Sequence, residues 1–154
     1  MKRLSLILAL SMLSACAPKD EPHNPLVCDA AFSPAVSQFQ SDSVKIKGVA
    51  QSLENLTIEF SAPGALLSQR EAAVCDQNGG IKTIQVDPIW WSSHDEIYQK
   101  NVIYHELGHC VLGRGHRNDI LDGMHYASLM NSYSYVNDAF YLDNEKYYIN
   151  ELFN

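Results

Sequence analysis

The sequence predicts an α+β domain from three observations: short segments with strand character, a turn signal between two of them, and helical signals on either side. The candidate strands are residues 56–60, 72–75 and 81–86. The candidate helices are residues 33–48, 93–112 and 143–153. We expect a single domain in which a small twisted sheet packs on the helices at 33–48 and 93–112.

The first and last helices are marked at their starts. Ser33-Pro34 is typical of a helix beginning, with a capping side chain followed by proline in the first turn, and Gly48 is expected to close this helix. Asp143 is the expected cap of the terminal helix. The expected packing residues are Val36, Phe39, Val44 and Ile46 in the first helix and Tyr147, Ile149 and Phe153 in the last.

The strands are indicated by alternation and by turns. Residues 56–60 read Leu-Thr-Ile-Glu-Phe, an apolar and polar alternation that is typical of a half-buried strand. Asn78-Gly79 lies between the other two candidate strands and favours a hairpin. Asp87-Pro88 is expected to end the second strand of this hairpin.

The helix at residues 93–112 carries the most capping signals. Ser93 and Glu96 form a capping-box pattern, and Asp95 adds negative charge at the positive end of the helix dipole. Gly113 can end the helix in a left-handed conformation. The helix is therefore expected to stop just before a turn that glycine permits.

The N-terminal segment has the pattern of an export signal. Met1-Lys2-Arg3 precedes an apolar run, residues 4–13, which is shorter than the roughly 20 residues of a membrane-spanning helix. The run ends in Leu-Ser-Ala-Cys, which resembles a bacterial lipobox, and lipidation would then fall on Cys16. The expected segments are a signal peptide at 1–15, a tether at 16–25 and a domain at 26–154. The alternative is an ordinary signal peptide with an incidental cysteine.

Length and charge limit the classes of function. The chain has 154 residues and a formal net charge of −7. This length suits one domain, and an acidic chain without a basic run argues against nucleic acid as a partner. We expect a monomer at the bacterial cell envelope, lipid-anchored on its periplasmic or cell-surface face.

Three cysteines remain beyond Cys16, and an exported protein can form disulfides. Three is an odd number, so one internal bridge leaves one free thiol. Cys28 with Cys75 is the preferred bridge. The pairing of Cys75 with Cys110 is a close alternative, in which Cys28 would be free.

The segment from His105 to His109 reads His-Glu-Leu-Gly-His and carries the main chemical signal. Histidines four residues apart on a helix lie about 40° apart around the axis and about 6 Å apart along it, so both imidazoles can reach one Zn²⁺ ion. Glu106 lies between them and can take a proton from a water on the metal. This is the H-E-x-x-H arrangement of zinc peptidases.

A peptidase site needs a third protein ligand and one open position. His116 is the first candidate, because Gly113 and Gly115 precede it and allow the chain to fold back. Asp119 is the second candidate, and Glu145 in the terminal helix is a third.

At these residues the chain resembles the metzincin clan of zinc peptidases, whose signature is H-E-x-x-H-x-x-G-x-x-H followed by a methionine turn. The first half matches, while Gly113 and His116 each come one residue later than in the signature. Residues 128–131, Ser-Leu-Met-Asn, resemble the methionine turn with Met130 as its base. By the same resemblance Tyr133 would be a transition-state donor, one residue later than in the clan.

The closer resemblance is to small, largely uncharacterised bacterial lipoproteins of the zinc metallopeptidase type, and it covers residues 56–153. It is carried by Asp87, Trp90 and Trp91, by the His-Glu-Leu-Gly-His-Cys segment, and by the later histidine and Ser-Leu-Met segments. The resemblance implies a zincin-type fold with an active-site helix and a backing helix.

The expected function is zinc-dependent hydrolysis of peptide bonds, with water activated by Glu106. An extended peptide or protein substrate is expected to pair with the edge of the hairpin near residues 72–75. The rival interpretation is a non-catalytic zinc lipoprotein that acts as a binding or assembly module.

Overall fold

The computed structural model describes residues 23–67, 71–133 and 139–154. Its strands are β1 (Val27–Cys28), β2 (Leu56–Phe60), β3 (Ala73–Asn78) and β4 (Ile81–Val86). Its helices are α1 (Ser33–Lys47), α2 (Pro88–Ser93), α3 (Glu96–Cys110) and α4 (Ala139–Phe153), and a 3₁₀ turn (Ala30–Phe32) precedes α1. The predicted α+β class with a small sheet is confirmed.

The sheet has the strand order β1-β2-β4-β3, so β3 lies at an edge. The first three strands in this order are parallel, whereas β3 pairs antiparallel with β4. The predicted hairpin is confirmed, but its turn is Gly79-Gly80, because Asn78 still pairs with Ile81. Both glycines have positive φ, at 58° and 83°, as the favoured two-residue hairpin turns require.

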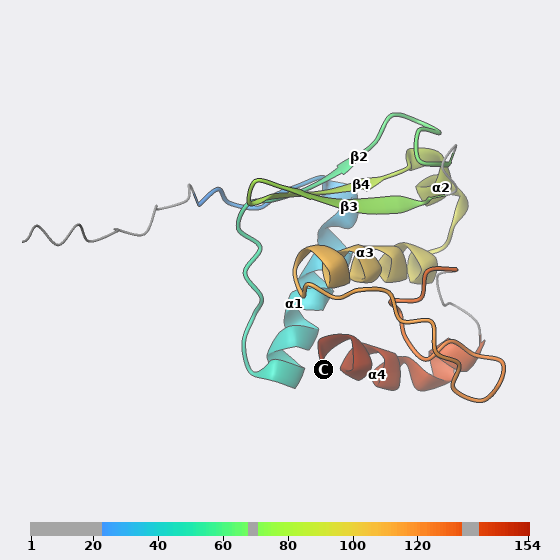
Figure 1. Cartoon of the computed structure of the whole chain (residues 1–154). Coiled ribbons are helices and arrows are strands. Elements are labelled where there is room, and N and C mark those ends of the chain that lie inside the picture. Colours follow the sequence, from blue (N-terminus) through green and yellow to red (C-terminus); the bar gives the residue numbers. More distant parts are fainter. Residues whose placement is uncertain (1–22, 68–70, 134–138) are drawn as a thin grey trace, which may run out of the picture.

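Helix α3 lies at the centre of the molecule, between the sheet on one side and α4 on the other (Figure 1). Its side chains from Asn101 to Gly108 are buried, so it is covered on nearly all sides. Helix α1 packs mainly on α3 and α4. Phe39 of α1 joins the three helices, since its ring centroid lies 5.4 Å from that of Tyr104 and 4.9 Å from that of Phe153.

Several predicted helix ends are wrong. Helix α1 begins at Ser33 with Pro34 in its first turn and is closed by Gly48 at φ 76°, as predicted, but Ser33 is not its cap: the capping position is Phe32, which makes no side-chain cap. Ser93 ends the short helix α2, and Asp95 caps α3 by accepting hydrogen bonds from the two backbone N–H groups of its first turn. Helix α4 begins four residues before Asp143 and is kinked at Asn144.

Two predicted packing residues lie at the surface. Val44 of α1 is 48% exposed, because it lies on the face of the helix that points away from α3 and α4. Tyr147 is 38% exposed, and its neighbour Tyr148 is the buried residue. Val36, Phe39, Ile149 and Phe153 are buried as predicted.

The preferred disulfide is also wrong: Cys75 pairs with Cys110, and Cys28 is free. The register explains this, because Cys28, Ile58, Ile84 and Cys75 form one row across the sheet. Cys28 and Cys75 therefore lie three strand spacings apart, about 14 Å, which is beyond the reach of a disulfide. Cys110 of α3 lies under the sheet with its Cα atom 5.8 Å from that of Cys75.

This disulfide joins the edge strand to the central helix and closes a separation of 35 residues. Replacing both cysteines by serine is expected to lower the free energy of unfolding by about 2–4 kcal/mol, because the unfolded chain loses a constraint. Urea unfolding measures the change. Cys28→Ser is the control, and an equal loss in that variant would contradict the assignment.

The predicted signal peptide, Cys16 and the first part of the tether lie outside the described residues. The first described residue, His23, contacts the domain, with its Nδ1 atom 2.8 Å from a Glu54 carboxylate oxygen. The backbone N–H of Asn24 donates to the Asn55 side chain, and its carbonyl accepts from the Asn55 N–H. Among the described residues, the helices are too short or too polar to cross a membrane.

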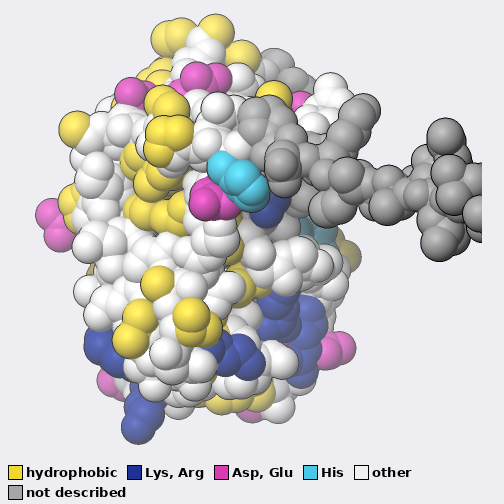
Figure 2. Space-filling view, turned by 90° about the vertical axis from the view of Figure 1, so that its left-hand side faces the viewer, with side chains coloured by type: hydrophobic (Ala, Val, Ile, Leu, Met, Phe, Trp, Pro, Cys, Tyr) yellow, Lys and Arg dark blue, Asp and Glu magenta, His cyan; other side chains and the backbone are white. Residues whose placement is uncertain are grey.

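The side of the molecule on which α1 ends has a mixed surface. Figure 2 shows hydrophobic side chains grouped in a band there, with lysine and arginine side chains gathered toward the lower part. The last turn of α1 contains Lys45 and Lys47, where positive charge suits the negative end of the helix dipole.

Candidate metal centre

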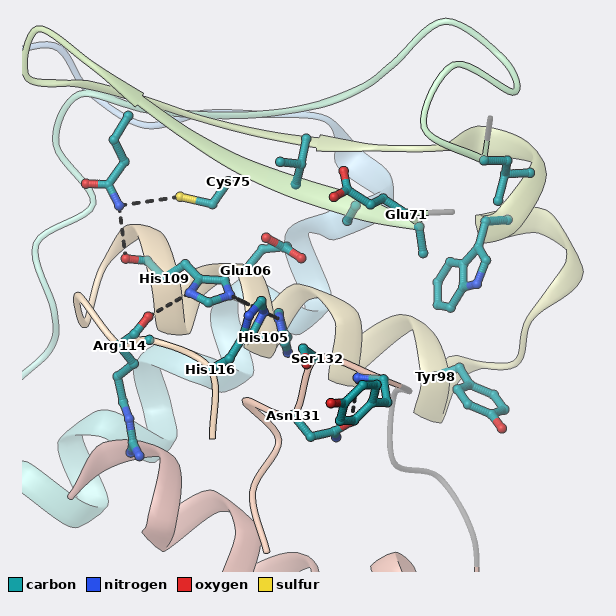
Figure 3. Close-up of a pocket in the computed structure, with 18 of the residues that line it drawn as sticks. Glu71, Cys75, Tyr98, His105, Glu106, His109, Arg114, His116, Asn131 and Ser132 are labelled. Carbon is teal, nitrogen blue, oxygen red and sulfur yellow. Dashed lines mark hydrogen bonds between the residues drawn. The ribbon is translucent and has the colours of Figure 1, made fainter. Parts of the chain in front are cut away.

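The last two turns of α3 bring His105 and His109 together. Their Nε2 atoms lie 3.1 Å apart, and the Nε2 atom of His116 lies 3.3 Å from the first and 3.2 Å from the second. Figure 3 shows the three rings turned toward one another. The sequence thus predicted the three residues that the fold brings together.

The orientation of the rings shows what this cluster can hold. His105 places Nδ1 2.7 Å from the Leu129 carbonyl, and His109 places Nδ1 2.6 Å from the Arg114 carbonyl. A carbonyl only accepts hydrogen bonds, so both Nδ1 atoms carry the proton and both Nε2 atoms present lone pairs. Lone pairs that face each other are stabilised by a shared cation, so the three histidines can hold a metal ion.

Burial favours the same state. It lowers the pKa of His105 to about 4, an effect that the hydrogen bond with the Leu129 carbonyl partly opposes. Burial also lowers the pKa of His109. Both imidazoles are therefore neutral at pH 7, which is the form that binds metal.

The chain reverses after α3 to deliver His116. Gly113 takes the predicted left-handed conformation, at φ 65°, and the Arg114 N–H donates to the Gly108 carbonyl at 2.9 Å. The Arg117 N–H then donates to the Met130 carbonyl at 2.8 Å. These two bonds flank His116 and hold it against the end of the helix.

The other two ligand candidates lie outside this cluster. The Asp119 side chain is 69% exposed and accepts a hydrogen bond from Arg117. Glu145 lies on α4 and pairs with Lys100. Neither belongs to the group whose ligand atoms lie within 4.8 Å of one another.

Glu106 lies beside the histidines and under the edge strand (Figure 3). Its side chain is only 3% exposed, and burial raises its pKa to about 8. A hydrogen bond with the Cys75 backbone lowers the pKa, whereas the Glu71 carboxylate raises it further. The site therefore contains a carboxyl group that can exchange a proton near neutral pH.

Met130 forms a floor beneath the last turn of α3. It is fully buried, in a turn at residues 128–131 that Asn131 N–H closes onto the Ser128 carbonyl. A Cβ atom at Gly108 would lie 2.3 Å from the Met130 sulfur and 3.2 Å from Leu152. Any side chain at Gly108 would therefore have to displace the buried Met130 side chain from the helix backbone.

Gly108→Ala is expected to destabilise the fold by about 1–3 kcal/mol, because the methyl group overpacks this contact. The turn that carries the Leu129 carbonyl must shift, so metal affinity should fall as well. Thermal unfolding and metal titration measure both effects. Gly115→Ala is the control, since its Cβ would meet nothing within 4 Å; equal behaviour of the two variants would argue against this packing.

A cleft of about 970 Å³ runs past the histidines. Residues 72–75, at and just before the start of the edge strand, line one wall, and Trp90, His94 and Tyr98 form an aromatic wall beyond Glu106. Asp87 positions this wall, because it caps α2 and accepts the N–H groups of Ile89 and Trp90. Tyr133 also lines the cleft and is 72% exposed, so its role as a donor stays a prediction.

The sequence did not predict that Glu71 and His94 line the cleft. Glu71 precedes the edge strand, and His94 stacks on Trp90 with ring centroids 4.1 Å apart. The only sequence signal for His94 is that it lies four residues after Trp90 and four residues before Tyr98. That spacing is informative only once the break between α2 and α3 is known.

Comparison with protein-family models, with curated proteins and with solved structures finds no match for this chain. The structure itself defines an α+β domain with a three-histidine candidate metal centre on its central helix. The function must therefore be argued from the site.

Proposed function

We propose that this protein is a zinc-dependent peptidase with a zincin-type arrangement of its central helix, edge strand and methionine turn. The observation that carries the proposal is a triangle of three imidazole Nε2 atoms with a buried carboxyl group, Glu106, beside it. A protein with a purely structural metal site has no need of that carboxyl group.

The spacing of the triangle supports zinc. Three nitrogens about 2.0–2.1 Å from one zinc ion, at the corners of a tetrahedron, lie about 3.3 Å from one another. The Nε2 atoms lie 3.1–3.3 Å apart. Three protein ligands leave the fourth position open, as in catalytic sites, whereas structural zinc is usually held by four protein ligands.

Zinc, when bound, lowers the pKa of a water in the open position to about 7 and polarises the carbonyl of a substrate. A side-chain oxygen of Glu106 would take a proton from the attacking water as the oxygen of that water bonds to the carbonyl carbon of the substrate. The same oxygen of Glu106 would then give the proton to the amide nitrogen as the carbon–nitrogen bond breaks. A raised pKa suits this double task, because a base that is too weak cannot take the proton and one that is too strong cannot return it.

The edge strand supports an extended substrate. β3 is antiparallel to β4 and lies at the margin of the sheet, directly beside Glu106. Its outer backbone groups can pair with a peptide main chain, which gives affinity without strong sequence preference. The aromatic wall of Trp90, His94 and Tyr98 suits an apolar or aromatic side chain of the substrate.

Metal analysis and a peptide-library digest test the proposal together. The purified protein is expected to contain one zinc per chain and to cleave peptides, and a chelator should remove both metal and activity. Stoichiometric zinc without cleavage of any peptide would count against hydrolysis and favour the binding or assembly module.

We also propose that Cys16 is the lipidated N-terminus, on the pattern of the segment that precedes it. Cys16→Ser is expected to release the exported protein from the membrane fraction, which cell fractionation measures. A variant that stays with the membrane would show that another element holds it there.

A further inference from the structure

Glu151 of α4 lies at the centre of a buried polar network behind the three histidines. Its side chain is 8% exposed and accepts hydrogen bonds from three partners. Arg114 donates at 2.6 Å and Arg117 at 2.9 Å, both to Oε1. The Ser128 hydroxyl donates to Oε2 at 2.6 Å.

Each partner is linked to a different histidine. The carbonyl of Arg114 accepts the Nδ1 proton of His109. Arg117 directly follows His116 in the chain. Ser128 begins the turn whose next residue, Leu129, accepts the Nδ1 proton of His105, and its hydroxyl also accepts the Met130 N–H at 3.0 Å.

The backbone of α4 takes part in the same network. One guanidinium nitrogen of Arg114 donates to the carbonyls of Glu151 and Leu152, the latter at 2.8 Å. The Leu152 side chain also packs close to Gly108, since a Cβ atom added to this glycine would lie 3.2 Å from the Leu152 side chain. The end of α4 is thus attached to the segment after α3 and to the turn beneath it.

We propose that Glu151 is a positioning residue for the metal centre, which fixes all three histidine ligands through Arg114, Arg117 and Ser128. A buried carboxylate that accepts hydrogen bonds from charged donors holds these donors firmly in place, because the loss of any one bond leaves a charged group unpaired. The segment from Gly113 to Met130 has little regular structure of its own, and this one side chain holds it near both ends, through Arg114 and Arg117 at its start and Ser128 toward its end. The inference rests on the metal site of the proposed function and is independent of peptide hydrolysis.

The test compares Glu151→Gln with Glu145→Gln. Glu145 lies on the same helix, accepts a hydrogen bond from Tyr141 and pairs with Lys100, and both of these partners lie outside the segment from Gly113 to Met130. Glu151→Gln is expected to weaken zinc binding by about 10–100-fold, as the loss of an outer partner of metal ligands typically does. Competition with a chromophoric chelator measures the affinity. Glu145→Gln should bind zinc like the wild type.

Two further readouts separate positioning from stability. At saturating Co²⁺, the visible absorption of Glu151→Gln should differ from that of the wild type, because the geometry of the ligands changes. Urea unfolding of the metal-free variants measures stability alone. If Glu151→Gln does not fold, Arg117→Gln replaces it, since Arg117 is 42% exposed and its loss removes one link; a smaller fall in affinity is then expected.

Wild-type affinity and an unchanged cobalt spectrum in Glu151→Gln, or in Arg117→Gln where that variant replaces it, would overturn the inference while leaving the proposed function intact. Zinc binding without hydrolysis in the wild type would overturn the function and leave the inference standing. A wild-type protein that binds no zinc would overturn both.

Discussion

Glu106→Gln is expected to lower kcat/KM for peptide hydrolysis by about 10²–10⁴-fold while zinc remains bound. The substitution removes the proton acceptor and keeps the size and shape of the side chain. Glu106 does not belong to the group of three histidines proposed to hold the metal, so the substitution leaves these ligands unchanged. Cleavage of a fluorogenic peptide and zinc analysis of the same sample measure the two expectations.

Removal of a buried ionisable group can also raise the stability of the fold. Burial already raises the pKa of Glu106, so the charged form is disfavoured in the site, and the neutral amide avoids that penalty. Glu106→Gln should therefore unfold at the same temperature as the wild type or higher. This separates lost catalysis from lost structure.

Glu96→Gln is the matched control for the catalytic prediction. Glu96 lies in the first turn of the same helix, and it does not line the cleft. Its replacement should leave hydrolysis near the wild-type rate. Equal rates for Glu106→Gln and the wild type would exclude Glu106 as the base.

The sequence predicted best those features that depend on neighbouring residues. β2 and β4 begin and end at the predicted residues, because alternation and turn signals are local. The left-handed residue after α3 was also predicted, since only glycine adopts that conformation easily. The histidine pair follows from helical spacing alone.

Features that depend on the register or on distant segments were missed or wrong. The disulfide required the row of residues across the sheet, which brings Cys75 over α3 and leaves Cys28 at the opposite edge. Asp87-Pro88 does end β4 as predicted, but the short helix α2, which the same dipeptide caps and begins, was missed. Glu151 has no local signal at all, because its partners lie between 23 and 37 residues away in the chain.

His116→Ala is expected to weaken zinc binding by far more than the roughly 10–100-fold expected for an outer partner, because it removes one of three protein ligands. The Nε2 atom of His116 completes the triangle at 3.2 Å and 3.3 Å from the other two. The side chain is exposed, so truncation should change the stability of the metal-free fold little. Chelator competition measures the affinity, and hydrolysis should fall with zinc occupancy.

Asp119→Asn is the matched comparison, because Asp119 lies three residues further along the same segment. Its carboxylate points to Arg117 and is largely solvated, so the variant should keep one zinc per chain. Asp119 does not belong to the histidine group, so the segment would have to reorganise for its carboxylate to reach the metal. Full zinc affinity in His116→Ala together with its loss in Asp119→Asn would show that such a rearrangement occurs, and the centre would then consist of two histidines and one carboxylate.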